Sequence, residues 1–273
     1  MPDRRSLPPM GAIEFAIDKA FRHCFFALGL VIGWAMLLLP LVALAWYVAF
    51  RSGLPDVKAL SPAAMGVLGL LGLCVLLACF SMGVNWNRRI VLDERPTLLG
   101  RWRLDGVVWR YIAGVLLLVV VLAIYVGVGF GILTAAVPAL AIKLGGAAKP
   151  AMFALTVLLG LSGLFTLYRL ASWLPGLATG DGAYGLGTAW RVTSKNRFAF
   201  LSFTFWLLFT LAIMGGLGAG AFFAQQSLPQ PWVKPVAFAV IGALVWLALL
   251  VIHSVPAALY RAFCGVEFGG SEP

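Results

Sequence analysis

The chain has 273 residues, of which 62% are hydrophobic and 11% are charged, and its mean hydropathy is +0.98. A soluble globular domain carries about 25% charged residues, so this composition excludes a protein whose whole surface faces water. The net charge of +10 would suit nucleic acid in a soluble protein, but in a membrane protein basic residues gather in cytoplasmic loops, so no nucleic-acid partner is expected.

Long apolar runs separated by short charged clusters predict an all-α polytopic membrane protein, folded as a single integral membrane domain over residues 1–273. A spanning helix needs about 20 mostly apolar residues. Six segments meet this requirement: 25–50, 63–86, 111–135, 151–174, 198–223 and 236–260. Pro138 is expected to end or kink the third apolar run. The segments between the spans are shorter than a soluble domain of about 50 residues, so a separate catalytic domain is not expected.

The start of the chain and its charge distribution predict the orientation. The first apolar run is expected to be a retained span, because Glu14 and Asp18 precede it and it is longer than the apolar core of a signal peptide. The side that holds both termini carries 15 Lys and Arg residues, against 5 on the opposite side. Since basic loops stay in the cytoplasm, both termini are predicted to lie there.

A weak threefold repeat divides the six spans into three helical hairpins. An aromatic residue followed by arginine precedes each outward-going span, in Ala20-Phe21-Arg22, Val108-Trp109-Arg110 and Ala189-Trp190-Arg191. The returning spans end at Asn87-Arg88-Arg89, Tyr168-Arg169 and Tyr260-Arg261. Ordinary anchoring by aromatic residues and arginine at a membrane boundary produces the same pattern, so duplication and anchoring both stay open.

Three segments near these motifs are amphipathic: 11–24, 97–110 and 183–197. They predict interfacial helices at headgroup depth. With the basic loop 87–110 they would form a basic cytoplasmic collar that contacts anionic phospholipid or a membrane protein partner, at about 1 kcal/mol for each basic side chain. The residues expected to make these contacts are Arg22, Arg88, Arg89, Arg101, Arg103, Arg110, Arg169, Arg191, Arg261, Trp102, Trp109 and Trp190.

Polar groups at membrane depth are costly, so each is a candidate for function. His253 and Asn85 form a possible intramembrane polar site, although a histidine bonded to a neighbouring backbone carbonyl is the plainer interpretation of His253. No Asp or Glu lies in a predicted span, which argues against a proton- or sodium-coupled transporter.

Neither a cofactor nor a catalytic residue is expected. The cysteines show no ligand spacing, and the sequence contains no hydrolase, zinc-protease or nucleotide-binding motif. Glycines four residues apart are typical of close helix packing, either within the chain or in a homodimer. Such pairs are Gly29/Gly33, Gly127/Gly131 and Gly216/Gly220.

Two stretches carry a resemblance to a known family. They are WNRRIVLDERP at residues 86–96 and YRLASWLPGLATGDGAYGLGTAWRVTSKN at residues 168–196. They resemble uncharacterised six-span bacterial inner-membrane proteins related to the membrane domain of glycerophosphodiester phosphodiesterases. The phosphodiesterase domain of that family is absent from this sequence. The resemblance therefore implies a six-span fold in the bacterial inner membrane and carries over no catalytic residue.

These observations favour a non-enzymatic integral membrane protein, an accessory or structural component that engages anionic lipid or a protein partner. The alternative is a transporter or channel for a small or anionic solute. A lipid-active enzyme is a third possibility, and it would need carboxylates that converge at the cytoplasmic face. The available ones are Asp93, Glu94, Asp105 and Asp181.

Reporter fusions test the predicted orientation. Fusions at positions 56 and 230 should report the outside, and fusions at position 95 and at the C-terminus the inside, because these positions alternate between the two predicted sides. A reporter active only outside and one fluorescent only inside are compared at each position. A reversed signal at any of them would exclude the three-hairpin arrangement.

Overall fold

The computed structural model describes residues 8–51, 61–97, 99–227, 230 and 232–264. These residues are 91% helical and contain no strand. The helices are α1 (Pro9–Arg22), α2 (Cys24–Arg51), α3 (Pro62–Leu92), α4 (Gly106–Leu144), α5 (Ala148–Ala171), α6 (Leu174–Thr179), α7 (Leu186–Lys195), α8 (Arg197–Ser227) and α9 (Val233–Cys264). Two short 3-10 turns, η2 (Leu99–Trp102) and η3 (Gly145–Ala147), complete the set.

Among the described residues, six helices are long and apolar enough to cross a membrane: α2, α3, α4, α5, α8 and α9. The predicted fold class, an all-α polytopic membrane protein, is therefore confirmed. Several helices extend beyond the predicted spans, since α3 continues to Leu92 and α4 already begins at Gly106. Pro138 does not end its helix, because α4 continues past it to Leu144.

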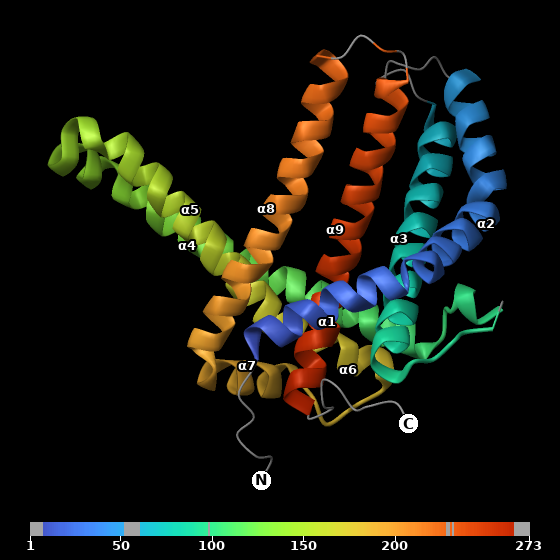
Figure 1. The fold of residues 1–273 in the computed structure, drawn as a ribbon, viewed down its shortest axis with the longest axis horizontal. Helices are drawn as coiled ribbons and strands as arrows, with labels where there is room; N and C mark the ends of the chain where they lie inside the picture. The colour runs from blue at the N-terminus through green and yellow to red at the C-terminus, as the bar shows by residue number, and fades with distance from the viewer. Residues whose placement is uncertain (1–7, 52–60, 98, 228–229, 231, 265–273) are drawn as a thin grey trace.

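The spanning helices pair as three hairpins of neighbours in sequence, α2 with α3, α4 with α5, and α8 with α9 (Figure 1). The short helices α1, α6 and α7 all lie toward one end of the molecule. We call this end the basic end, because Arg88 of α3, Arg169 of α5 and Arg261 of α9 contact α6, α7 and α1 there.

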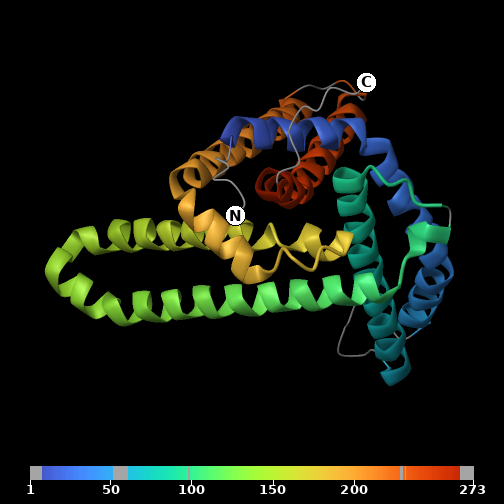
Figure 2. The ribbon, with the colours of Figure 1, turned by 90° about the horizontal axis from the view of Figure 1, so that it is seen from below.

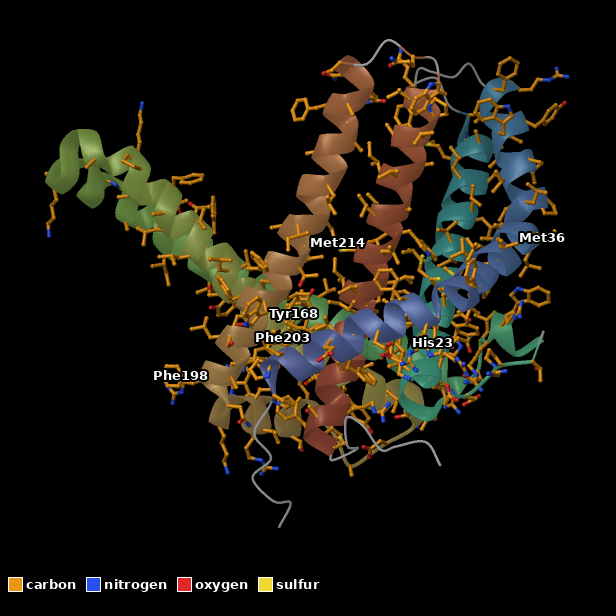
Figure 3. The ribbon with its side chains drawn as sticks, in the orientation of Figure 1. His23, Met36, Tyr168, Phe198, Phe203 and Met214 are labelled. Atoms are coloured by element: carbon orange, nitrogen blue, oxygen red, sulfur yellow. The ribbon has the colours of Figure 1, made fainter. Side chains whose placement is uncertain are left out.

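The main buried core lies at the basic end. The amphipathic helix α1 buries Ala12, Ala16 and Ala20 on one face, which packs against α9 and α8. Tyr168 and Phe203 lie in this core beside α1 in Figure 3. The apolar face of α1 is thus covered by protein.

Away from the basic end the helices separate and their apolar side chains are exposed. The α4–α5 hairpin leads away from the other helices as a long arm (Figure 2). Ile142 near the tip of this arm is 85% exposed, and Phe153 is 73% exposed. Such surfaces are stable when lipid surrounds them, which agrees with the spanning assignment.

The continuous interfacial helix predicted over 97–110 is wrong. Residues 99–102 form η2, residues 103–105 are not helical, and α4 begins at Gly106. Asp105 causes this break, because its carboxylate accepts hydrogen bonds from the backbone N–H of Val107 at 3.1 Å and of Val108 at 3.3 Å. An aspartate in this position caps a new helix. The segments predicted as amphipathic helices over 11–24 and 183–197 are occupied by α1 and α7.

Candidate functional site

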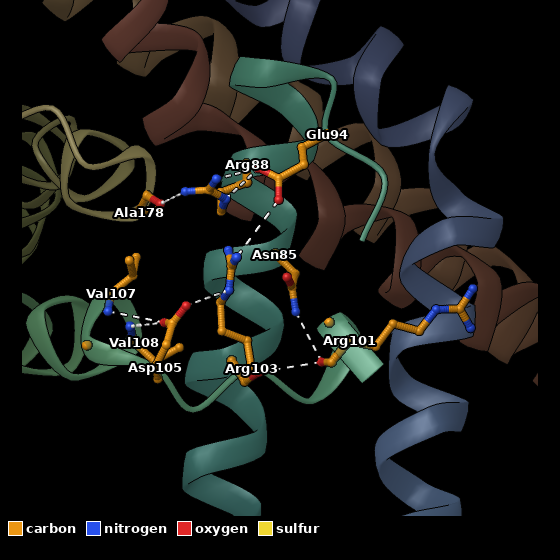
Figure 4. A network of polar contacts seen from close by, with 12 residues as sticks. Asn85, Arg88, Glu94, Arg101, Arg103, Asp105, Val107, Val108 and Ala178 are labelled. Carbon is orange, nitrogen blue, oxygen red and sulfur yellow. Dashed lines mark hydrogen bonds and ion pairs between the residues drawn. The ribbon is translucent and has the colours of Figure 1, made fainter. Parts of the chain in front are cut away.

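An ion-pair network ties the loop after α3 to the helices of the basic end (Figure 4). The Nε of Arg88 donates to Glu94 at 2.7 Å, and its Nη1 donates to the carbonyl of Ala178 in α6 at 3.1 Å. Arg103 lies between Glu94, at 3.9 Å, and Asp105, at 2.9 Å. These contacts fix the loop against α3 and α6. The charges of Arg88, Glu94, Arg103 and Asp105 are thus paired within the protein.

Polar groups of α3 hold η2 against the helix. The amide of Asn85 donates to the carbonyl of Arg101 at 3.1 Å, and Asn85 is only 2% exposed. On the other side, Gly29 and Gly33 of α2 leave room for η2. A Cβ at Gly29 would lie 3.8 Å from the guanidinium of Arg101, and one at Gly33 would lie 3.6 Å from the indole nitrogen of Trp102. This glycine pair therefore serves packing within the chain.

His253 and Asn85 do not share a site in the structure. His253 is exposed on α9, and its Nδ1 lies 2.8 Å from the carbonyl of Leu249 in its own helix. Asn85 instead contacts η2, and neither residue lines the two cavities that flank α5. The two side chains thus have separate local partners.

The four candidate carboxylates all have partners. Asp93 pairs with Arg89 at 3.0 Å, while Glu94 and Asp105 belong to the network described above. Asp181 accepts a hydrogen bond from the hydroxyl of Tyr260 at 2.6 Å. Within the described ranges, no group of three or more His, Cys, Asp or Glu residues forms a metal site.

The arginines of the predicted collar fall into two groups. One group forms ion pairs with carboxylates and consists of Arg22, Arg88, Arg89 and Arg103. The other group has no carboxylate partner among the residues that the structure describes and consists of Arg101, Arg110, Arg169, Arg191 and Arg261. Within the described part of the chain, the charge of this second group is not neutralised by a carboxylate.

Two of these arginines face outward beside tryptophans. Arg110 at the start of α4 and Arg191 on α7 are exposed. The preceding residues Trp109 and Trp190 are 56% and 46% exposed. We call these four residues the exposed rim. An aromatic ring beside a cation is the composition that favours the boundary between headgroups and acyl chains.

Arg169 differs from the rim because it is buried, with only 8% of its surface exposed. Its guanidinium donates to the hydroxyl of Thr193 at 3.0 Å and to the carbonyl of Trp190 at 3.2 Å, and it also donates to the Ser194 hydroxyl. It stacks on the ring of Trp190, 3.9 Å from the centroid. These contacts attach α7 to α5, and all the acceptors are neutral.

A groove of about 700 Å³ lies between α5 and α8 and is lined at one end by Arg169, Ser194 and Arg197. Sequence reasoning did not single out Arg197. A signal was present, because between residues 106 and 266 the sequence contains one acid, Asp181, against several cations. Since Asp181 is bonded to Tyr260, the cations around α7 have no carboxylate available nearby in the sequence.

No protein-family model matches the chain, and comparisons with curated proteins and with solved structures find no match. The resemblance to the membrane domain of glycerophosphodiester phosphodiesterases therefore stays a prediction.

Replacing Glu94 with Gln tests the ion-pair network. The change removes the negative charge that Arg88 and Arg103 share. It should lower the free energy of unfolding by about 1–3 kcal/mol, which lies between the contributions of exposed and of buried ion pairs. Thermal unfolding in detergent measures the loss. Glu14→Gln, which alters an exposed carboxylate of α1, should unfold like the wild type. If both variants unfolded at the same temperature, the ion-pair network would not stabilise the fold.

His23 lies between α1 and α2 and is expected to make stability depend on pH. Burial lowers its pKa below the ordinary 6.5, and so do the charges of Arg89 and Lys19, while Asp93 and Asp18 oppose them. The folded state binds this proton less tightly than the unfolded state does. The free energy of unfolding is therefore highest above pH 6.5 and decreases as the pH falls below that value.

The test compares the two histidines of the chain. Between about pH 7 and about pH 5 the unfolding temperature of the wild type should drop more than that of His23→Gln, since glutamine does not titrate. His253→Gln, at an exposed position, is the matched control and should keep the wild-type dependence. The same pH dependence in His23→Gln and the wild type would show that His23 has no such role.

Proposed function

We propose that this protein is a non-enzymatic component of the bacterial inner membrane that engages anionic phospholipid through its basic end, with both termini in the cytoplasm. The excess of basic residues on the side of the termini supports the orientation. The division of the arginines supports the lipid contact, because Arg88 and Arg103 are neutralised by carboxylates of their own loop, while Arg110 and Arg191 are exposed and have no carboxylate partner among the described residues.

The exposed rim is the observation that carries the proposal. Trp109 with Arg110, and Trp190 with Arg191, place an exposed ring beside an exposed cation on two different elements. An indole prefers the boundary between water and hydrocarbon, and a guanidinium there meets phosphate groups. A cytoplasmic leaflet that contains anionic lipid attracts each such cation by about 1 kcal/mol.

The experiment neutralises the rim and compares it with the opposite end. In the double variant Arg110→Gln/Arg191→Gln, the preference for phosphatidylglycerol over phosphatidylcholine should fall by up to about 2 kcal/mol, since each charge contributes about 1 kcal/mol. Native mass spectrometry of the full chain with each lipid measures this preference. The matched control, Arg51→Gln/Lys234→Gln, removes the same charge from exposed residues at the opposite ends of α2 and α9.

The two double variants separate the possible results. A loss in the rim variant that exceeds the loss in the control supports the proposal. An equal loss in both variants would mean that net charge alone sets the preference and would contradict a role for the basic end. An unchanged preference in the rim variant would remove lipid binding from the proposal and leave docking of a protein partner as the better explanation.

A further inference from the structure

The groove between α5 and α8 has two antiparallel walls of equal length. One wall runs from Leu158 to Arg169 on α5, and the other from Arg197 to Leu208 on α8. At about 1.5 Å per residue each wall covers about 16 Å. This length matches about half of a hydrocarbon core that is about 30 Å thick, which is the depth of one leaflet.

The walls are apolar along most of this length. The lining side chains outside the cationic end are Leu158, Leu161, Ser162, Phe165, Phe198, Leu201, Thr204, Phe205 and Leu208. The two hydroxyl groups among them are satisfied within their own helices, because Ser162 donates to the carbonyl of Leu159 at 2.8 Å and Thr204 donates to that of Phe200 at 2.9 Å. The groove therefore offers an acyl chain a surface without unsatisfied donors.

One end of the groove is cationic and lacks a counter-charge. Arg169 and Arg197 both line it, and no Asp or Glu is among its lining residues. Arg169 is more than nine-tenths buried, yet its hydrogen-bond acceptors are all neutral. A buried charge is stable when an opposite charge is close to it, so this end of the groove is complementary to an anion.

The position of α8 adds to this complementarity. The helix begins at Arg197, so the backbone N–H groups of its first turn lie at the cationic end of the groove. Phe198, the next residue, extends away from the bundle in Figure 3 and is 83% exposed. An exposed ring at this position suits the boundary between headgroups and acyl chains.

We propose that this groove binds one anionic phospholipid, with its phosphate at Arg169, Ser194 and Arg197 and an acyl chain along the apolar walls. A free phosphate would occupy only the cationic end, and a neutral lipid would leave Arg169 without a counter-charge. The inference rests on the proposed function in that anionic lipid is the ligand, but it assigns a single site distinct from the exposed rim.

A second cavity gives the matched control for the experiment. It has a volume of about 370 Å³ on another face of α5, and none of its lining residues is charged. Val121 lines this second cavity, while Ser162 lines the groove. Tryptophan at either position fills a cavity that borders α5, without changing the net charge.

The experiment follows retention of one dioleoyl phosphatidylglycerol molecule by the full chain in native mass spectrometry, as collision energy is raised. Arg197→Gln removes an exposed cation and should lower retention about tenfold or more, the value of a lost charge-assisted hydrogen bond. Ser162→Trp fills the groove and should also lower retention, because the acyl chain loses the surface that it would cover. Lys234→Gln, which removes an exposed cation at the opposite end of the spans, and Val121→Trp should retain the lipid as the wild type does. Thermal unfolding verifies that each variant is folded, and either groove variant alone suffices for the test.

The outcomes distinguish this site from the proposed function. Wild-type retention in a folded groove variant would overturn the groove site, even if the rim variant still loses its general preference for anionic lipid. Equal retention of dioleoyl phosphatidylcholine would overturn the role of the two arginines. Displacement of the lipid by excess inorganic phosphate would overturn the role of the apolar walls, because phosphate competes only at the cationic end.

Discussion

The packing of α1 against α9 and α8 is the interaction on which the arrangement of the hairpins depends. Lipid solvates apolar helix surfaces as well as another helix does, so apolar character alone does not hold spanning helices together. Close contact requires small residues, and α1 supplies Ala12, Ala16 and Ala20 on the face that meets the core around Phe200 and Phe203. Because this packing lies at the basic end, the outer parts of the helices are free to separate and meet lipid.

The arginines at the basic end serve two different purposes for a physical reason. Where a carboxylate is close in sequence, as Glu94 is to Arg88, the charge is neutralised locally and the pair fixes a loop. Arg169 has no such neighbour, and it is held by the hydroxyl and carbonyl groups of α7 and by the ring of Trp190. These neutral groups hold the guanidinium in place but do not neutralise its charge. The charge therefore remains available to an anion.

Periodicity and hydropathy predict the elements whose structure depends on local sequence. The six spans and the alanine-rich helix α1 follow from runs that need no distant partner. The packing of η2 against Asn85 and Ser81 depends on contacts between residues 16 or more apart, which periodicity does not contain. The break at Asp105 is local, because this carboxylate caps the backbone N–H groups two and three residues further on, but the apolar periodicity does not register a cap. The groove could not be predicted, because Arg169 and Arg197 meet only after α5 and α8 are placed, although the scarcity of acids after Asp105 indicated unpaired cations.

The departure of the α4–α5 arm and the groove have the same origin. Gly114 lets α4 pass close to Leu177 of α6, so the arm is attached near its base and α5 diverges from α8 beyond that point. Arg169 lies near the end of α5, and it bonds α7 to α5 while it lines the groove. An anion bound there would therefore contact the residue that joins the arm to α7, and its charge would oppose the mutual repulsion of the two arginines. A lipid bound in the proposed groove would thus contact the same guanidinium group that joins α5 to α7.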